Sequence, residues 1–379
     1  MEESTRMPNA PRVAMTLTQD WHRVPGGTAV AANALARALR DTGDVSLTGV
    51  GPAGPPPGEP WNPPVDTRAL RLRLPWLYEA WDRLRRPRVT SAVPDAELVH
   101  LTVPIACPPE RVPVVATVHD VLPLTMPEMF TRRGVRLMRR GLERIRDEAA
   151  VVMVPSNMGA DEFVRQGFDR SRLAVVHLGV NPVAEPSSSS VEKALARHGL
   201  SDPYVLFVGT DEPRKGLDVL AAALGAMDRT DVTLALVGPE GWDSRDHDGS
   251  AVALGRLGDR VRRLGFVHDT DLDLLRAGSA VCCLPSRAEG FGLPVLEAMA
   301  AGAPVVTTSG TPMEEFAGGV ARLVPPGDAG ALAEALSEVI DDPETAEGMR
   351  GAGRERAARF SWTSSAEAVL EVYRRVLGS

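Results

Sequence analysis

Two glutamates, Glu289 and Glu297, flank the segment of the sequence that carries the most chemical information. An apolar run ends at Leu284, Pro294 suits the first turn of a helix, and Gly302 suits its end. The pattern predicts a strand, a glycine-bearing loop and a helix. The amino end of such a helix favours a phosphate, because its N–H groups and dipole point outward. The two carboxylates would accept hydrogen bonds from hydroxyl groups, which a sugar supplies.

A second segment, from Val208 through Gly209 to Gly216, also joins a predicted strand to a helix and contains Arg214 and Lys215. Charge-assisted hydrogen bonds contribute about 1.5–3 kcal/mol each, so this basic pair could hold a diphosphate and stabilise it as a leaving group. The alternative is a solvated pair of loop cations, which stabilises little.

Alternation of short β-branched runs with longer helical patterns predicts an α/β fold of two doubly wound parallel sheets. Ligands bind beyond the carboxyl ends of the strands in such sheets, so we expect the chemistry in a cleft between two domains facing each other. The expected strands are 13–18, 45–48, 98–102, 114–118 and 151–155 in the first half and 204–208, 233–237, 281–284 and 304–308 in the second. The expected helices are 29–39, 131–147, 217–224, one from 295 and one after 362.

The serine-rich stretch 184–190 is typical of an exposed connector and marks a domain boundary. We therefore expect a disordered tail over residues 1–10, a first domain over 11–183 and a second over 191–361. The proline- and glycine-rich stretch 51–58 is predicted to be a surface loop.

Composition excludes several classes of function. The 379 residues carry a net charge of −8, which argues against nucleic acid as a partner, because phosphate backbones require a basic surface. Cys107, Cys282 and Cys283 are too few and too badly spaced for a disulfide framework or a zinc site, and a reducing cytosol is the default compartment. We find neither a membrane-spanning run nor a secretory signal, so a cytoplasmic protein is expected.

The spacing of Glu289 and Glu297 around Gly-Phe-Gly-Leu-Pro, together with Glu212-Pro-Arg-Lys-Gly216, resembles the retaining glycosyltransferases of family 4. The likeness covers almost the whole chain. Further comparable segments are Pro25-Gly-Gly-Thr28, Thr117-Val-His-Asp120, Val154-Pro-Ser-Asn157, His177-Leu-Gly-Val180 and Gly265-Phe-Val267.

This resemblance implies a GT-B fold, with the acceptor on the first domain, the nucleotide-sugar donor on the second, and the helix 362–379 returning to the first. By position, Arg214 and Lys215 would bind the donor diphosphate, Glu289 the transferred sugar and Glu297 the ribose. His119 would lie beside the sugar. The remaining expected donor contacts are Gly26, Gly27, Gly209, Phe266, Val267, Phe291, Gly292 and Leu293. The family needs neither a metal nor a cofactor.

The expected function is transfer of a hexose from a UDP- or GDP-linked donor to a hydroxyl of a small molecule, glycolipid or polysaccharide, by a monomer or homodimer. Alternatives are another GT-B enzyme, such as a nucleotide-sugar epimerase or a phosphorylase, and a non-catalytic nucleotide-sugar sensor. A dinucleotide oxidoreductase ranks low, because Gly-x-Gly-x-x-Gly is missing after the first strand of either half.

Two features of the first half stay open. The arginine-rich helix 131–147 fits an ordinary solvated face, which we favour, or a weak peripheral contact with an anionic membrane. Trp61, Trp76, Tyr78 and Trp81 could stack on sugar rings, although Trp76 and Trp81 fit a core equally well.

Overall fold

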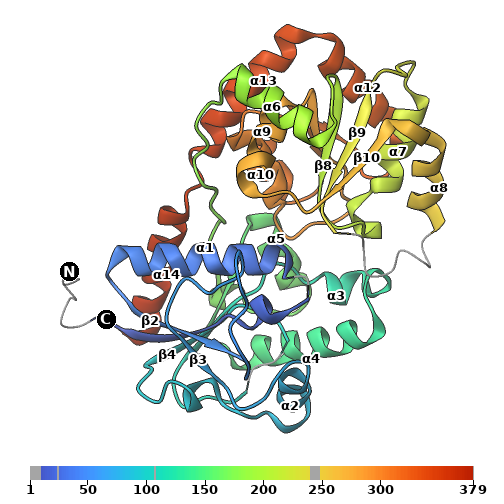
Figure 1. The fold of residues 1–379 in the computed structure, drawn as a ribbon. Helices are drawn as coiled ribbons and strands as arrows, with labels where there is room; N and C mark the ends of the chain where they lie inside the picture. The colour runs from blue at the N-terminus through green and yellow to red at the C-terminus, as the bar shows by residue number, and fades with distance from the viewer. Residues whose placement is uncertain (1–9, 24, 106–107, 240–247, 379) are drawn as a thin grey trace. The chain divides into compact units, whose positions relative to one another are not determined.

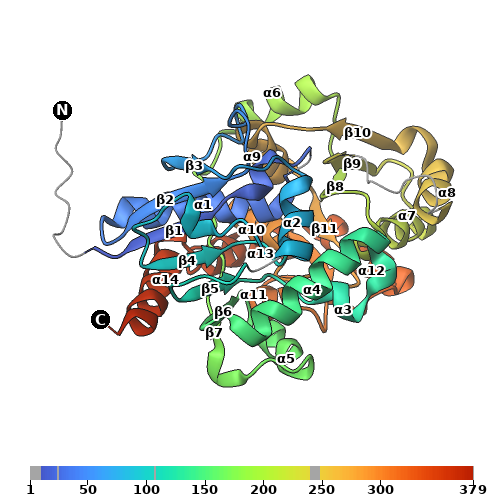
Figure 2. The ribbon, with the colours of Figure 1, turned by 90° about the horizontal axis from the view of Figure 1, so that it is seen from below.

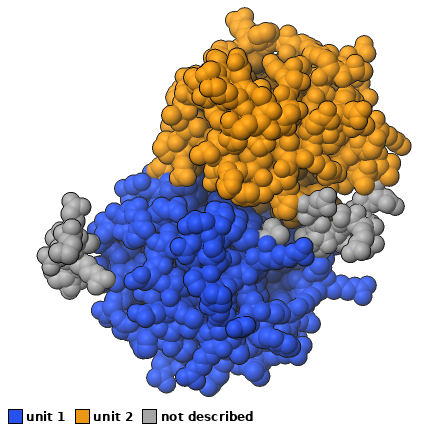
Figure 3. Space-filling model, viewed as in Figure 1, with its two compact units in different colours: residues 1–179, 362–379 blue, residues 180–361 orange. Residues whose placement is uncertain are grey.

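A computed structural model describes residues 10–23, 25–105, 108–239 and 248–378. The chain divides into two compact units, residues 1–179 with 362–379 and residues 180–361 (Figure 3). The predicted tail, apart from residue 10, and Cys107 lie outside the described residues.

Unit 1 is built on a seven-stranded parallel sheet of order β3-β2-β1-β4-β5-β6-β7 (Figure 2). Successive residues of β1 point to opposite faces, so Ala14 enters one apolar cluster while Val13 and Met15 enter the other. Both faces are therefore covered, as parallel sheets require. The strands are β1 (Arg12–Thr16), β2 (Ser46–Gly51), β3 (Thr67–Ala69), β4 (Leu98–Leu101), β5 (Val114–Thr117), β6 (Val151–Val154) and β7 (Leu173–Val175).

The helices of unit 1 lie on the two faces of this sheet. One apolar cluster includes residues of the neighbouring helices α1 (Gly26–Thr42) and α14 (Trp362–Leu377) (Figure 1). The other includes residues of α2 (Trp76–Leu84), α4 (Arg132–Glu148) and α5 (Asn157–Arg165) (Figure 2). Two short elements, η1 (Thr18–Trp21) and α3 (Leu122–Thr125), follow β1 and β5.

Unit 2 has a six-stranded parallel sheet of order β10-β9-β8-β11-β12-β13. Its strands are β8 (Tyr204–Val208), β9 (Thr233–Val237), β10 (Val261–Gly265), β11 (Val281–Leu284), β12 (Val305–Thr308) and β13 (Arg322–Val324). Its helices are α6 (Ser188–His198), α7 (Leu217–Ala226), α8 (Asp248–Leu257), α9 (Asp269–Gly278), α10 (Leu293–Ala300), α11 (Met313–Ala317), α12 (Ala329–Asp341) and α13 (Pro343–Ala357).

The two chain segments that join the units meet each other. Val180 forms a parallel bridge with Ser361, and its N–H donates to the Phe360 carbonyl at 2.9 Å. Unit 2 therefore begins and ends at one point of the chain's path.

The predicted connector 184–190 is wrong from Ser188 onward. Ser187 caps α6 by accepting a hydrogen bond from the Ser190 N–H, and Ser188 to Ser190 form the first helical turn. Serine is a preferred N-cap, and this side-chain hydrogen bond satisfies an otherwise unpaired backbone donor. A serine run that resembles a flexible linker is thus a helix start. The helix expected at 29–39 likewise begins earlier, at Gly26.

Candidate functional site

The candidate site of unit 2 lies where the strand order of its sheet reverses. β8 and β11 are neighbours, with Val281 opposite Val205, and their crossover connections lead to opposite edges of the sheet. The segment 209–216 follows the carboxyl end of β8, and 285–292 follows that of β11. Parallel strands place both segments at the same edge, which is the usual ligand position in such sheets.

Backbone and side-chain contacts hold these two loops together. Gly216 has φ +70°, and a Cβ there would stand 2.2 Å from the Pro285 carbonyl oxygen, so only glycine allows this approach. The Arg287 N–H donates to the Arg214 carbonyl at 2.7 Å. Its guanidinium donates to both carboxylate oxygens of Asp218, at 2.8 and 2.7 Å. The positions of Arg214 and Lys215 are therefore fixed relative to the second loop.

Glu289 accepts hydrogen bonds from three side chains of these loops. Lys215 Nζ lies 2.5 Å from Oε1, Ser286 Oγ lies 2.8 Å from the same oxygen, and Arg214 Nη1 lies 3.1 Å from Oε2. Arg214 also donates through Nε to Glu212 at 2.8 Å. Burial alone would raise the pKa of Glu289, but the charges of Lys215 and Arg214 outweigh it and hold that pKa at about 2. The carboxylate is ionised at neutral pH.

The solvated-pair alternative for Arg214 and Lys215 is wrong. The Lys215 side chain is 9% exposed and its partner Glu289 7% exposed. An ammonium group has three N–H donors, and among the described residues one of them is used, by Glu289. The remaining donors are available to a phosphate oxygen that enters this edge of the sheet.

Glu297 lies in a separate ion-pair cluster on α10. It pairs with Arg276, which also donates to Asp273 at 2.9 Å. Burial raises the pKa of Glu297, and Arg276 opposes that shift. Sequence reasoning missed Arg276 and Ser286. An arginine within the apolar helical run after Leu272, and a serine directly after a buried strand, are the signals that could have found them.

Gly292 begins α10 in the left-handed region, at φ +96°, and a Cβ there would stand 2.3 Å from Met313 Cγ. As the N-cap it has no side chain to satisfy the N–H groups of the first turn. The preceding Phe291 is buried against Phe316, with ring centroids 4.9 Å apart. Pro294 has no N–H, and the Val295 N–H donates to the Gly292 carbonyl at 2.9 Å, so the donor that the start of α10 offers is the backbone N–H of Leu293.

Phe266 and Val267 follow β10, two strands from β8 in the sheet order. Phe266 is 61% exposed, and its ring contacts His268 edge-on at 5.1 Å, whereas Val267 is buried. Gly209 accompanies them at this edge, because its N–H donates to the Val237 carbonyl at 2.9 Å. The expected donor residues of the second half thus follow β8, β10 and β11 at one edge of the sheet of unit 2.

The expected residues of the first half belong to unit 1. His119 follows the carboxyl end of β5 and is partly buried, and burial lowers its pKa to about 4, so the imidazole is neutral at pH 7. Gly26 and Gly27 form the first turn of α1, Gly26 at φ +70° with open space where a Cβ would stand.

A buried polar cluster at the carboxyl ends of β1 and β4 escaped sequence reasoning. Asp20 is 1% exposed, accepts a hydrogen bond from Asn33 at 3.1 Å, and has no described partner for its second oxygen. Burial raises the pKa of Asp20 to about 7, and the hydrogen bond from Asn33 opposes the shift. Tyr78 donates to Thr18 at 3.0 Å and lies 2.8 Å from a ring nitrogen of His22. Asp20 stands between a strand and a helix, where a polar residue resembles part of an ordinary loop, so nothing in the sequence signals its burial. Tyr78, which the sequence places among the aromatic residues that could stack on a sugar, is buried in this cluster.

The arginine-rich helix α4 is not simply a solvated face. Its Arg133 and Arg136 pair with Glu79 of α2, and Arg140 pairs with Asp82 at 3.1 Å. Trp81, one of the aromatic residues expected either in a core or on a sugar, is fully buried, whereas Trp76 is 69% exposed.

Within the part of the chain that the structure describes, no helix has the length and apolarity to cross a membrane. Likewise, no three His, Cys, Asp or Glu side chains of the described ranges are grouped as metal ligands.

Comparison with known proteins assigns both units. Residues 25–183 match the family model described as Glycosyltransferase Family 4, and residues 202–342 match Glycosyl transferases group 1. The O-antigen chain mannosyltransferase B of Escherichia coli is 30% identical over 313 residues, 81% of this chain and 82% of that protein. The chain belongs to the family 4 glycosyltransferases. The predicted transferase is confirmed, and the oxidoreductase and sensor alternatives are set aside.

Other relatives of this glycosyltransferase carry different substrates in their names. The D-inositol 3-phosphate glycosyltransferase of Mycolicibacterium smegmatis is 32% identical over 243 residues, 62% of this chain and 55% of that protein. Among solved structures, Anabaena HepE in complex with UDP and glucose matches with a TM-score of 0.77 at 21% identity, covering 96% of this chain and all of that one. Sucrose-phosphate synthase from Thermosynechococcus elongatus matches with a TM-score of 0.76 at 23% identity, covering 97% and 99%. The predicted GT-B fold of two Rossmann-like units is confirmed.

Proposed function

We propose that this glycosyltransferase moves a hexosyl group from a UDP- or GDP-linked sugar to an acceptor hydroxyl with retention of the anomeric configuration and without a metal ion. The observation that carries the proposal is the cluster of Lys215, Arg214 and Glu289 where the strand order of unit 2 reverses. A fold neighbour, Anabaena HepE, is described in complex with UDP and glucose, which supports a uridine nucleotide as donor.

The cluster has the chemistry of a diphosphate site. Among the described residues, Lys215 uses one of its three N–H donors, and the Leu293 N–H at the start of α10 adds a second positive pole. Positive charge fixed before the reaction stabilises the charge that develops on a leaving diphosphate, a role that a metal ion plays in other enzymes. Glu289 accepts three hydrogen bonds from the part of the chain that the structure describes, and a carboxylate has about four acceptor positions, which leaves one for a sugar hydroxyl.

The proposed reaction needs no protein nucleophile. The bond between the anomeric carbon and the diphosphate oxygen breaks, and the acceptor oxygen forms its bond on the same face of the sugar. The acceptor proton passes to an oxygen of the departing diphosphate. His119 is neutral at pH 7, so its imidazole would exchange hydrogen bonds with a sugar hydroxyl rather than act as a cation.

The test requires no knowledge of the acceptor, because water can replace it. A thermal-shift series with UDP, GDP, ADP and dTDP identifies the base, since a ligand at about a hundred times its dissociation constant adds about 2.7 kcal/mol. Proton NMR then follows slow hydrolysis of the sugar donor that carries this base. The first hexose released is expected to have the anomeric configuration of the donor, and a chelator is expected to leave the rate unchanged.

A pair of matched variants tests whether Phe266 contacts the nucleobase or whether any loss of exposed apolar surface weakens binding. Phe266→Ala is expected to weaken nucleotide binding about tenfold, because stacking on a base is worth about 1–3 kcal/mol. Val252→Ala, at another exposed apolar residue of unit 2, is the control and should bind normally. Release of the opposite anomer would overturn the proposal of retention. If neither UDP nor GDP raised the thermal midpoint, the donor assignment would be overturned.

A further inference from the structure

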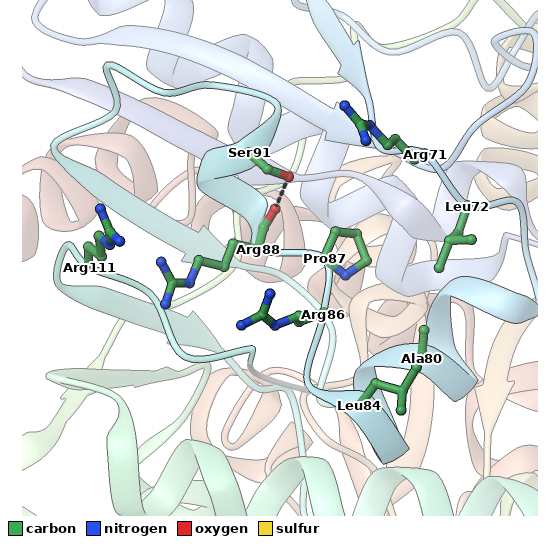
Figure 4. Close-up of a pocket in the computed structure, with 9 residues that line it drawn as sticks. All are labelled: Arg71, Leu72, Ala80, Leu84, Arg86, Pro87, Arg88, Ser91 and Arg111. Atoms are coloured by element: carbon green, nitrogen blue, oxygen red, sulfur yellow. Dashed lines mark hydrogen bonds between the residues drawn. The ribbon is translucent and has the colours of Figure 1, made fainter.

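A pocket of about 530 Å³ lies in unit 1, beside the end of α2 (Figure 4). It is formed by Arg71, Leu72, Ala80, Leu84, Arg86, Pro87, Arg88, Ser91 and Arg111. These residues come from the segment before α2, from α2 itself, from the loop after it and from the segment before β5. None of them belongs to the proposed donor site or to the elements that carry His119 and Asp20.

The pocket has two chemically different ends. In Figure 4 the guanidinium groups of Arg86, Arg88 and Arg111 are drawn toward one end, and the side chains of Ala80 and Leu84 toward the other. Ala80 and Leu84 are one helical turn apart on α2, and Leu84 is 72% exposed. The pocket therefore combines a cationic end with an apolar wall.

The arginines of this pocket differ from neighbouring arginines in the ion pairs that they form with described residues. Arg133 and Arg140 of α4 pair with Glu79 and Asp82 on α2, and Arg85 pairs with Glu148. By contrast, no ion pair joins the guanidinium of Arg71, Arg86, Arg88 or Arg111 to any residue that the structure describes.

The nearby acidic residue Glu110 does not neutralise this cluster by contact. Its carboxylate accepts from the Val89 N–H and the Thr90 hydroxyl, both at 2.6 Å, and so holds the loop after α2 in place. The whole chain has 42 basic and 50 acidic side chains, so this positive surplus is local. The charge of Glu110 acts on Arg88, but the like charges of the other arginines repel, and a multiply charged anion would remove that repulsion.

We propose that this pocket binds an amphiphilic organic phosphate, a phosphate or diphosphate group attached to an apolar chain. The planar guanidinium fork matches two phosphate oxygens at once, and several arginines together favour a diphosphate. The chain attached to that phosphate would lie on Leu72, Ala80 and Leu84, where its burial removes apolar surface from water. The site is independent of the proposed donor function.

Isothermal titration of the full chain with farnesyl diphosphate, inorganic pyrophosphate and farnesol tests the site. Farnesyl diphosphate is expected to bind at least about tenfold more tightly than pyrophosphate, because the apolar wall contributes to binding only for the first. Farnesol is expected to bind far more weakly than either. Equal affinity for pyrophosphate and farnesyl diphosphate would overturn the amphiphile assignment.

Two double variants of equal charge change locate the binding. R86A/R111A is expected to lose about a hundredfold in affinity for farnesyl diphosphate, and the single R111A about tenfold, since charge-assisted hydrogen bonds contribute about 1.5–3 kcal/mol each. R132A/R139A removes two exposed arginines of α4 and is expected to bind normally. All four side chains are exposed, so the thermal midpoints should agree. Equal binding by both double variants, or equal loss in both, would overturn the proposal, as would no binding by the wild type.

Discussion

Glu289→Gln should destabilise unit 2, because it leaves Lys215 and Arg214 without their shared carboxylate. Lowering the pKa of Glu289 from 4.5 to about 2 corresponds to about 3 kcal/mol in favour of the ionised carboxylate. That value meets the lower end of the roughly 3–5 kcal/mol lost when one member of a buried ion pair is removed. At about 2–4 °C per kcal/mol, the thermal midpoint of unit 2 should fall by about 6–12 °C.

A double-mutant cycle with Lys215→Met measures the coupling directly. The double variant should lose at least about 1 kcal/mol less free energy of unfolding than the two single variants lose added together. The reason is that Lys215→Met removes a positive charge that Glu289→Gln has already left without its carboxylate. Glu338→Gln breaks the exposed pair with Arg322 and should cost less than about 1 kcal/mol. The wild type should lose the Glu289 contribution as the pH falls from 4.5 toward about 2, and Glu289→Gln should not. Strict additivity, or a Glu289→Gln cost no larger than that of Glu338→Gln, would refute the reasoning.

Two further predictions concern the buried carboxyl of unit 1 and the start of α10. The pKa of Asp20 is raised from 3.8 to about 7, so its contribution to stability is complete below 3.8 and falls by about 4 kcal/mol as the pH rises through about 7. Asp20→Asn should abolish this slope in urea denaturation at a series of pH values, and an unchanged slope would assign it to other groups. Gly292→Ala should cost about 2–5 kcal/mol in the same assay, because it combines left-handed strain with the approach to Met313. Gly348→Ala on the exposed face of α13 is its control and should be neutral or stabilise by up to about 1 kcal/mol, and equal effects of the two would contradict the steric argument.

Central strands were predictable from sequence and edge strands were not. The apolar runs of β8, β9 and β11 gave the observed bounds to the residue, since strands buried on both faces read as continuous apolar segments. β10 contains Arg262 and Arg263 in exposed positions, and β13 is three residues long, so neither has an apolar run to detect.

In the candidate site, too, some features could be predicted from the sequence and others could not. Glycines and charged residues at strand ends pointed to Arg214, Lys215 and Glu289, and the structure brings these three side chains together. The sequence could not predict which cation pairs with which carboxylate. Arg214 and Glu289 are 75 residues apart and come together only because β8 and β11 are neighbours in the sheet. The pocket beside the end of α2 could not be predicted from the sequence for the same reason, because the residues that line it come from separate segments.

The bridge between Val180 and Ser361 has a consequence for how this protein can be divided. Since both ends of unit 2 lie at one bridge, residues 180–361 form an insertion that could be excised as a single piece, without cutting any strand of either sheet. The gap left behind would be closed by joining Gly179 to Trp362 through a short spacer. The proposed binding of a nucleotide to unit 2 and of a phosphate amphiphile to the pocket of unit 1 could then be measured on separate polypeptides.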